Sequence, residues 1–315
     1  MTHEIMNCSI VIRAYNEEKH MGRLLEGILH QTLKDLEVIL VDSGSTDSTI
    51  AIAESHGTKI VRIPSDEFTF GRSLNFGVRA ATREFVVIVS AHVYPVYPDW
   101  LESLLRPFED ERVALSYGKQ RGPGSAKFSE QQIFHQWYPD ASQLNQSTAF
   151  CNNANAAIRR NLWEKNPYDE TLTGLEDLAW AKWAKEQGYA IAYVPEAEIL
   201  HVHDETLRGV FNRYRREAMA FKKIHPEAHF NLYDFMRLTT TNILSDMWHA
   251  ARERVLWKNL ASIFWFRFMQ FHGTRMGYRE SGLLTPQLRQ TFYYARERKP
   301  KGDATRDIKP IQYNE

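Results

Sequence analysis

Two short polar clusters near the N-terminus carry side chains that could bind a nucleotide. They are Ala14-Tyr15-Asn16-Glu17 and Asp42-Ser43-Gly44-Ser45-Thr46-Asp47, and each follows directly after a short apolar run. A carboxylate accepts hydrogen bonds from a ribose hydroxyl or a pyrimidine N–H, and an aromatic ring offers a face for stacking. Gly44 permits a tight turn, and Asp42 and Asp47 could instead cap turns. The clusters therefore indicate either a nucleotide site or a pair of capped turns.

The elements that would position these clusters alternate between strand and helix. Short, apolar, β-branched runs predict strands at residues 9–12, 38–41, 59–62, 85–89, 113–118 and 190–194. Apolar positions three and four apart predict helices at 21–29, 50–55, 71–81, 100–108, 178–187 and 207–223. In an open α/β sheet, ligands bind beyond the carboxyl ends of the strands, where both clusters fall. Residues 119–147 fit either a loop beside the active site or a short helix with packed aromatics.

Composition sets outer limits on the class of protein. The 315 residues are 43% hydrophobic and 25% charged, as in ordinary globular proteins, and 39 basic residues balance 39 acidic ones. This balance argues against a dedicated nucleic-acid binder. Cys8 and Cys151 alone support neither a disulfide scaffold nor a cysteine zinc site. Without a leader pattern or a run of about 18 apolar residues, we expect a cytoplasmic protein that is neither exported nor membrane-spanning.

Glycine patterns exclude several nucleotide-binding and hydrolytic motifs. The first strand is not followed by Gly-x-Gly-x-x-Gly, and no Gly-x-x-x-x-Gly-Lys-Ser/Thr is present, which removes the dinucleotide fingerprint and the P-loop. Ser43 and Ser45 are not in a Gly-x-Ser-x-Gly elbow, which removes the hydrolase interpretation. What remains is a nucleotide held by side chains.

Four ordered motifs carry a resemblance to a known family. They are 14–17, 41–47, Gly71-Arg72-Ser73-Leu74-Asn75-Phe76-Gly77 and Gly174-Leu175-Glu176-Asp177, and over residues 8–225 they resemble the inverting family-2 glycosyltransferases of the GT-A fold. The resemblance implies an α/β fold of GT-A type, a Rossmann-like mixed sheet with flanking helices and a helical C-terminal extension. It also implies a nucleoside-diphosphate sugar donor, with Glu17 near the ribose and Asp42 near the base. The donor-binding residues that we expect are Ala14, Tyr15, Glu17, Asp42, Arg72, Asn75, Ser90, Asn153 and Arg213.

The pair Glu176-Asp177 stands at the start of a predicted helix. Acids there complement the helix dipole and cap free N–H groups, which is the plain explanation. The resemblance implies instead that Asp177 is the catalytic base, with Glu176 orienting the acceptor or capping the helix. An inverting displacement needs only one base, on the face opposite the leaving nucleotide.

The sequence departs from the family at Ser90-Ala91-His92, where an Asp-x-Asp usually binds a divalent metal ion, manganese or magnesium. Neutral imidazole binds manganese and similar ions but is a poor ligand for magnesium. His201 and His203 alternate along an extended segment and so point the same way. Either His92, with His201 and His203, holds a softer divalent ion, or cations such as Arg72, Arg213 and Arg216 neutralise the diphosphate without a metal. A histidine that is hydrogen-bonded near a strand end without a ligand is the third interpretation of His92.

The composition changes from about residue 230. We expect a glycosyltransferase domain at 1–228, a helical extension at 229–295 and a flexible tail at 296–315. Met247 to Phe271 is rich in Trp and Phe with interspersed Arg and Lys. This segment would pack on the catalytic domain or on another subunit of a homo-oligomer. Alternatively, it would attach to the inner face of the membrane, where a lipid-linked acceptor lies.

The prediction is an inverting glycosyltransferase that moves a sugar to a hydroxyl of a glycan or lipid-linked acceptor, in surface or capsular polysaccharide synthesis. Two rivals remain open. A non-catalytic sugar-nucleotide or glycan-binding protein would explain the missing Asp-x-Asp. A nucleotidyltransferase also joins an α/β nucleotide fold to acidic metal ligands, but its glycine-rich basic first loop is not provided by Arg13-Ala14-Tyr15-Asn16.

Overall fold

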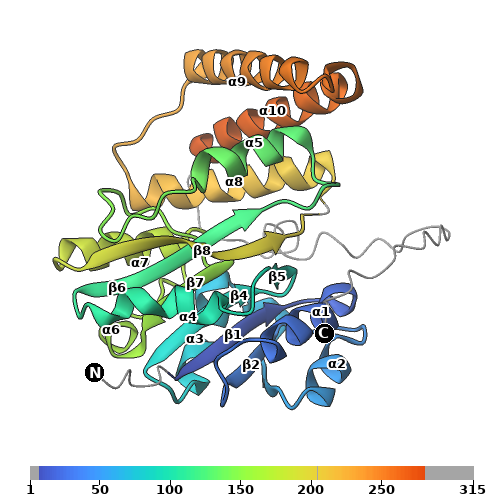
Figure 1. Ribbon diagram of the computed structural model, residues 1–315. Helices are drawn as coiled ribbons and strands as arrows, with labels where there is room; N and C mark the ends of the chain where they lie inside the picture. Colours follow the sequence, from blue (N-terminus) through green and yellow to red (C-terminus); the bar gives the residue numbers. More distant parts are fainter. Residues whose placement is uncertain (1–6, 204, 281–315) are drawn as a thin grey trace.

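The computed structural model describes residues 7–203 and 205–280 of the chain. Within these residues, eight strands form one sheet in the order β3-β2-β1-β4-β7-β6-β8-β5. Helices flank the sheet, and a further helical layer lies over one end of it (Figure 1). This is the predicted mixed α/β sheet with flanking helices and a helical C-terminal region.

The first half of the sheet is parallel and follows the predicted alternation. It consists of β1 (Cys8–Ala14), α1 (Glu18–Leu29), β2 (Glu37–Asp42), α2 (Thr49–Ser55), β3 (Lys59–Arg62), α3 (Phe70–Ala80) and β4 (Phe85–Ser90), with a 3₁₀ turn at Ser65–Glu67. Alternate residues of β1 face opposite layers of the core, with Ile10 and Ile12 on one side and Val11 on the other. Burial on both faces explains why these strands are continuously apolar in the sequence.

The second half of the sheet is mixed and was only partly predicted. It consists of β5 (Val93–Pro95), β6 (Val113–Arg121), β7 (Asn155–Arg159) and β8 (Ala190–His201). Between β5 and β6 lie α4 (Trp100–Leu105) and a 3₁₀ turn (Arg106–Glu109), and α6 (Arg160–Lys165) and α7 (Glu176–Glu186) separate β7 from β8. The prediction that the last strand ends before Pro195 was wrong. The β6–β8 register moves from Gly118–Val194 to Gln120–Ile199, so the proline lies in an irregularity of the pairing and β8 continues to His201.

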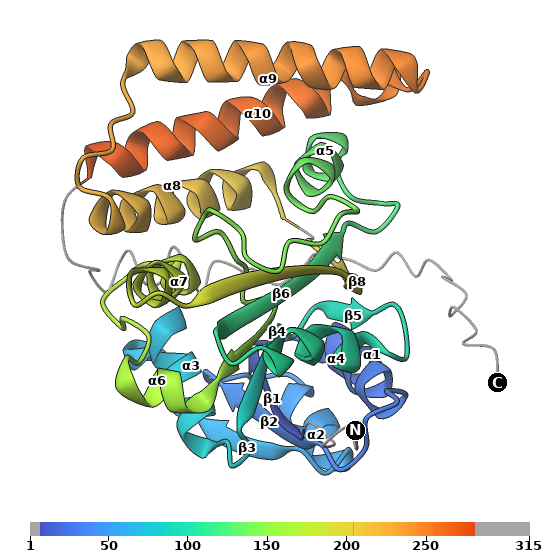
Figure 2. The ribbon, with the colours of Figure 1, turned by 60° about the vertical axis from the view of Figure 1, so that its left-hand side comes forward.

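The helical layer contains α8 (Leu207–Ile224), α9 (Leu232–Arg252) and α10 (Leu256–Arg279), together with α5 (Phe128–Trp137). Figure 2 shows α9 outermost, with α10 between α9 and α8. The axes of α8 and α10 approach closely because Gly273 and Gly277 face α8, where an added Cβ would lie 2.4 Å from Phe211 O and 2.3 Å from Arg215 O. The layer therefore includes α5 and α8, which precede residue 229.

None of the described helices combines the length and apolar character needed to cross a membrane. The predicted tail at 296–315, like the rest of 281–315, lies outside the described residues.

Candidate functional site

The loops that follow β1 and β2 meet at the carboxyl edge of the sheet. The Asn16 side chain accepts a hydrogen bond from Thr46 N at 2.8 Å, and Asn16 N donates to Ser45 Oγ at 2.9 Å. Glu17 N donates to Thr49 Oγ1 at 2.7 Å, at the start of α2. Asn16 has a φ of 53°, a conformation that asparagine tolerates better than most residues. The two polar clusters of the sequence thus form one continuous surface.

Asp42 holds the turn after β2. Its carboxylate accepts hydrogen bonds from Gly44 N at 2.9 Å and from Ser45 N at 3.1 Å, and the residue is only 2% exposed. Gly44 has a φ of 98°, which favours glycine and agrees with the tight turn expected there. The structure therefore confirms that Asp42 caps this turn. Contact of Asp42 with a base, like stacking on the half-buried Tyr15, stays a prediction.

Glu176 and Asp177 form what we call the carboxylate centre, at the first turn of α7. Asp177 Oδ2 accepts a hydrogen bond from Asn153 N at 3.0 Å, and Oδ1 accepts one from Leu178 N at 2.8 Å. Asp177 is 8% exposed; burial, and then the negative charge of Glu176, raise its pKa from 3.8 to about 7. Leu175 precedes the pair with a φ of 57°, an unusual conformation for a leucine. A carboxylate that titrates near neutrality suits a general base.

Arg13 joins the carboxylate centre to β1, a role that the sequence did not reveal. Arg13 Nη1 lies 3.4 Å from Glu176 Oε1, and the Arg13 guanidinium lies 4.7 Å from the centroid of the Phe70 ring. Arg216 of α8 lies 4.6 Å from the same ring. Because Arg13 is followed immediately by Ala14 and Tyr15, this ion pair places α7 beside the first polar cluster. The available signal was a lone charge inside the apolar run of β1.

His92, His201 and His203 come together, and we call them the histidine cluster. One ring nitrogen of each lies within 4.8 Å of those of the other two. The ring centroids of His201 and His203 are 4.0 Å apart, and those of His92 and His201 are 5.2 Å apart. Three nitrogen ligands at this spacing could hold a divalent ion.

Each imidazole of the histidine cluster donates Nδ1–H to a different acceptor. The distances are 3.0 Å from His92 to Glu17 Oε1, 2.8 Å from His201 to Gln120 Oε1 and 2.7 Å from His203 to Glu130 Oε1. These acceptors assign the proton to Nδ1 and leave Nε2 for a ligand. His201 Nε2 is buried and has no hydrogen-bond partner among residues 7–203 and 205–280. The residues present therefore fit a metal ion.

Burial also favours the neutral form of two members of the histidine cluster, His201 and His203. Burial, and then the electrostatic effect of the neighbouring imidazoles, hold the pKa of His201 well below its usual 6.5. Burial likewise lowers the pKa of His203, despite the opposing hydrogen bond to Glu130. Neutral imidazoles are the form that binds a metal. Glu17, expected at the ribose, contacts His92 in this structure, and its ribose contact stays a prediction.

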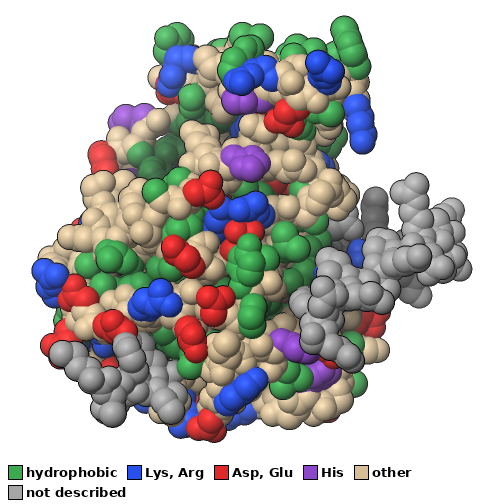
Figure 3. Space-filling model, viewed as in Figure 1, with side chains coloured by type: hydrophobic (Ala, Val, Ile, Leu, Met, Phe, Trp, Pro, Cys, Tyr) green, Lys and Arg blue, Asp and Glu red, His purple; other side chains and the backbone are tan. Residues whose placement is uncertain are grey.

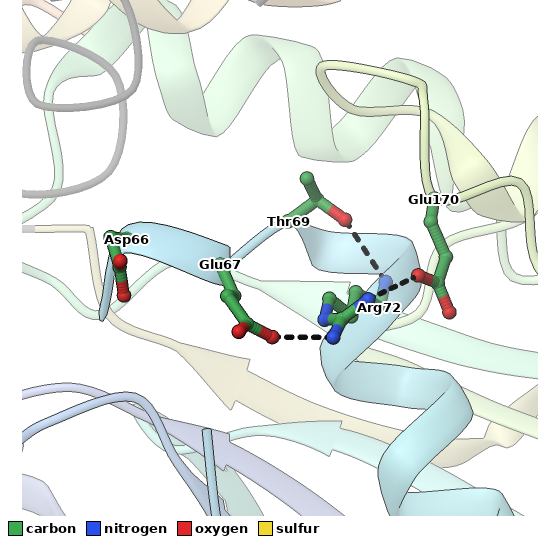
Figure 4. Close-up of a pocket in the computed structure, with 5 residues that line it drawn as sticks. All are labelled: Asp66, Glu67, Thr69, Arg72 and Glu170. Atoms are coloured by element: carbon green, nitrogen blue, oxygen red, sulfur yellow. Dashed lines mark hydrogen bonds and ion pairs between the residues drawn. The ribbon is translucent and has the colours of Figure 1, made fainter. Parts of the chain in front are cut away.

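Asn75 and Arg72, both expected at the donor, are committed to other contacts. Asn75 is 2% exposed: its amide donates to Tyr168 O and Glu170 Oε1, each at 2.9 Å, and accepts from Trp163 Nε1 and Tyr168 N. The Asn75 amide already makes all four of its hydrogen bonds, so it has none left for a nucleotide-sugar donor. Figure 4 shows Arg72 between Glu67 and Glu170, the latter at 3.1 Å, at the edge of an open hollow.

The remaining expected donor residues lie in three places. Arg213 is placed between Glu130 and Glu205, at 3.4 Å and 3.1 Å. Asn153 contacts Asp177 through its backbone. Ser90 ends β4, half-buried beside Arg13 of β1. The structure thus brings Ser90 and Asn153 next to residues that contact or form the carboxylate centre, and it gives Arg213 two acidic partners.

Comparisons with known proteins identify the family. Residues 9–166, half of the chain, match the model of the family described as glycosyl transferase family 2. The chain is 27% identical over 222 residues to the O-antigen chain rhamnosyltransferase RfbN of Salmonella typhimurium, covering 66% of this chain and 70% of RfbN. It is 23% identical over 261 residues to the poly(ribitol-phosphate) β-N-acetylglucosaminyltransferase TarS of Staphylococcus aureus. That match covers 80% of this chain but only 43% of TarS.

Solved structures show the same fold. The mannosyltransferase PcManGT of Pyrobaculum calidifontis, in complex with GDP-Man and Mn²⁺, has a TM-score of 0.57 at 17% identity, covering 91% of this chain and 87% of that one. TarS residues 1–349 with UDP-GlcNAc have a TM-score of 0.52 at 17% identity, covering 84% and 90%. These likenesses establish a GT-A fold and agree with the family match. The chain therefore belongs to glycosyl transferase family 2 and is a glycosyltransferase of the GT-A fold.

Proposed function

We propose that this enzyme moves a sugar from a nucleoside-diphosphate sugar to a hydroxyl of a growing surface polysaccharide, with inversion at the anomeric carbon. One observation carries the proposal: residues 13–17 contact both the carboxylate centre, through Arg13 and Glu176, and the histidine cluster, through Glu17 and His92. A group that can accept a proton therefore lies near groups that can hold a charged leaving group. The names of RfbN and TarS, which act on an O-antigen chain and on poly(ribitol-phosphate), support a polymeric acceptor.

Asp177 is the proposed general base. Its carboxylate takes the proton of the acceptor hydroxyl as the hydroxyl oxygen forms a bond to the anomeric carbon and the bond to the leaving diphosphate breaks. A pKa of about 7 leaves a large ionised fraction at pH 7–8 while keeping the group basic enough to accept the proton. Glu176, held by Arg13, is the proposed acceptor-orienting residue.

The histidine cluster is the proposed site of a divalent ion. A bound ion would supply positive charge that neutralises the leaving diphosphate. Imidazole nitrogens favour manganese and later transition metals over magnesium. The metal-free alternative relied on Arg72, Arg213 and Arg216. Arg72 and Arg213 each lie between two carboxylates already, and the Arg216 guanidinium lies 4.6 Å from the centroid of the Phe70 ring. This pairing favours the histidine cluster.

The assignment of Asp177 is tested by replacing it with asparagine. The parent, Asp177→Asn and a control, Glu164→Gln on the surface of α6, are incubated with UDP-, GDP- and dTDP-sugars and Mn²⁺. We expect donor turnover to fall by about 10²–10⁴-fold in Asp177→Asn alone, with nucleotide binding kept. Proton NMR of the product of the parent gives the anomeric configuration. Undiminished turnover in Asp177→Asn, or retention of configuration, would overturn the proposal.

The same assay separates the rival functions. A sugar-nucleotide or glycan-binding protein would bind donors without turnover in the parent. A nucleotidyltransferase would form a nucleoside-diphosphate sugar from a nucleoside triphosphate and a sugar phosphate, with release of pyrophosphate. Either result replaces the glycosyl-transfer proposal.

We also propose that the enzyme works at the inner face of the membrane, contacting anionic lipid through its outermost helices. Exposed apolar side chains recur along α9, mostly at intervals of four or eight residues, and continue into α10. This aromatic face consists of Leu232, Tyr233, Met236, Leu244, Trp248 and Trp257. Four exposed basic residues accompany it, Arg237, Arg252, Arg254 and Lys258, against one exposed acid, Glu253. Figure 3 shows hydrophobic and basic side chains together at this end. Aromatic rings flanked by cations suit an anionic lipid surface.

Sedimentation with lipid vesicles tests the membrane contact. We expect the parent to bind vesicles containing phosphatidylglycerol and to bind pure phosphatidylcholine weakly, and a Leu244→Ser/Trp248→Ser variant to lose binding. Leu29→Ser, which removes a comparably exposed leucine from α1, is the control. If the parent binds neither kind of vesicle and instead forms a dimer that the double variant abolishes, the aromatic face is a subunit contact and the membrane proposal fails.

A further inference from the structure

Helix α5 lies in the stretch for which the sequence left a loop and a short helix as alternatives, and it connects the other helices of the helical layer to the sheet. Phe128 packs against Ala250 of α9 and Ile263 of α10. Arg267 of α10 donates to Ser129 O at 3.5 Å and makes a buried bidentate pair with Asp246 of α9, at 2.7 Å and 2.8 Å. The first turn of α5 is therefore fixed by α9 and α10.

The next residue, Glu130, points the other way and reaches the histidine cluster. Glu130 is 4% exposed, and its Oε1 accepts from His203 Nδ1 at 2.7 Å and lies 3.4 Å from Arg213 Nη2. The partners of the other two histidines differ in origin, because Glu17 follows β1 and Gln120 belongs to β6. Of the three acceptors, only Glu130 is held by the helical layer.

We propose that Glu130 is a positioning residue for the ion at the histidine cluster, and that it makes the helical layer part of the metal site. This inference rests on the metal assignment made above. A carboxylate that accepts Nδ1–H fixes the tautomer of the imidazole, aims its Nε2 and makes it a stronger donor to a metal. Because α9 and α10 fix the first turn of α5, they set where His203 Nε2 points. The helical layer thus acts on the site without touching the ion.

Glu205 offers a matched control for the charge of Glu130. Both carboxylates pair with Arg213, so replacing either one removes one negative charge beside the same guanidinium. Glu205→Gln leaves the Glu130–His203 hydrogen bond in place, whereas Glu130→Leu removes it. Glu130→Gln keeps an acceptor of similar shape without the charge. The three variants separate the hydrogen bond from the electrostatic effect.

The experiment measures metal binding directly. Isothermal titration with Mn²⁺ and Co²⁺, and the visible absorption of bound Co²⁺, are recorded for the full chain and each variant, and the thermal transition without metal shows that each folds. We expect Glu130→Leu to weaken binding by about 10- to 100-fold and to alter the Co²⁺ spectrum. Glu130→Gln should retain most of the affinity, and Glu205→Gln should stay within about threefold of the parent.

Two results overturn the inference, and each differs from failure of the proposed function. If Glu130→Leu binds both ions as the parent does, or no more weakly than Glu205→Gln, Glu130 does not position the ion. If the parent binds neither ion at the histidine cluster yet transfers sugar in EDTA, the metal assignment and this inference fail while glycosyl transfer stands. Loss of transfer in the parent under every condition would instead remove the proposed function.

Discussion

The buried carboxylate centre and the partly buried histidine cluster both lie beside the loop that follows β1, but they are held in opposite ways. Asp177 is fixed by two backbone N–H donors, Asn153 N and Leu178 N. The three histidines are fixed by side-chain acceptors from three different segments, namely Glu17 after β1, Gln120 in β6 and Glu130 in α5. The position of Asp177 therefore depends on the path of the main chain, whereas the geometry of the cluster depends on side chains that substitution can remove one at a time.

Burial prepares both centres for neutral pH through opposite shifts. Desolvation disfavours the charged form of any group, so it raises the pKa of Asp177 to about 7 and lowers the pKa of His201 and His203. The carboxylate becomes a base with useful strength near pH 7, and the imidazoles of His201 and His203 remain neutral ligands. One physical cause thus produces a proton acceptor at one centre and metal-binding lone pairs at the other.

The two centres should differ most in metal binding, and replacing His201 should show this difference. Loss of an outer hydrogen-bond partner weakens metal binding by about 10- to 100-fold, so loss of a ligand such as that in His201→Ala should weaken it further. Bound metal should raise the melting temperature of the parent, because a ligand that binds only the folded state stabilises it. We expect this rise to disappear in His201→Ala.

Asp177→Asn is the matched comparison for that measurement. It changes the carboxylate centre but none of the three imidazoles or their acceptors, so its metal-induced rise in melting temperature should equal that of the parent. An unchanged rise in His201→Ala, or a lost rise in Asp177→Asn, would show that the ion binds elsewhere or that the two centres are not separate.

The sequence predicted the parts of the fold that rest on local patterns. The parallel strands β1, β2, β3 and β4 are apolar runs bounded by polar loops, and each was placed within a few residues. Glu176 and Asp177 were found at a helix start, and the three histidines were grouped through the departure at His92 and the alternation of His201 and His203. Burial on both faces of a parallel sheet leaves a signal in consecutive residues.

The parts that the sequence missed depend on contacts between distant segments. Strand β7 was not predicted; it contains Asn155, whose buried amide accepts a hydrogen bond from Trp100 Nε1 and donates to Lys119 O and Ala197 O. Strand β8 continues beyond Pro195 because the pairing with β6 is irregular there. Gln120 and Glu130 are ordinary polar residues until the fold places them against His201 and His203. No local pattern records such pairings, so these residues could be found only in the structure.

Glu176→Gln should produce a smaller and more specific effect, confined to the carboxylate centre. The negative charge of Glu176 raises the pKa of Asp177, so its removal should lower that pKa; Arg13, no longer paired with Glu176, should act in the same direction. Because the base must be ionised, transfer by the parent should rise with pH through about 7, and this rise should move to lower pH by on the order of one unit in Glu176→Gln. The measurement is kcat/KM against pH, with Glu164→Gln as the control. A shift to higher pH, or an equal shift in the control, would mean that Asp177 is not the titrating base. Metal affinity should not change in Glu176→Gln, since none of the acceptors of the histidine cluster is altered.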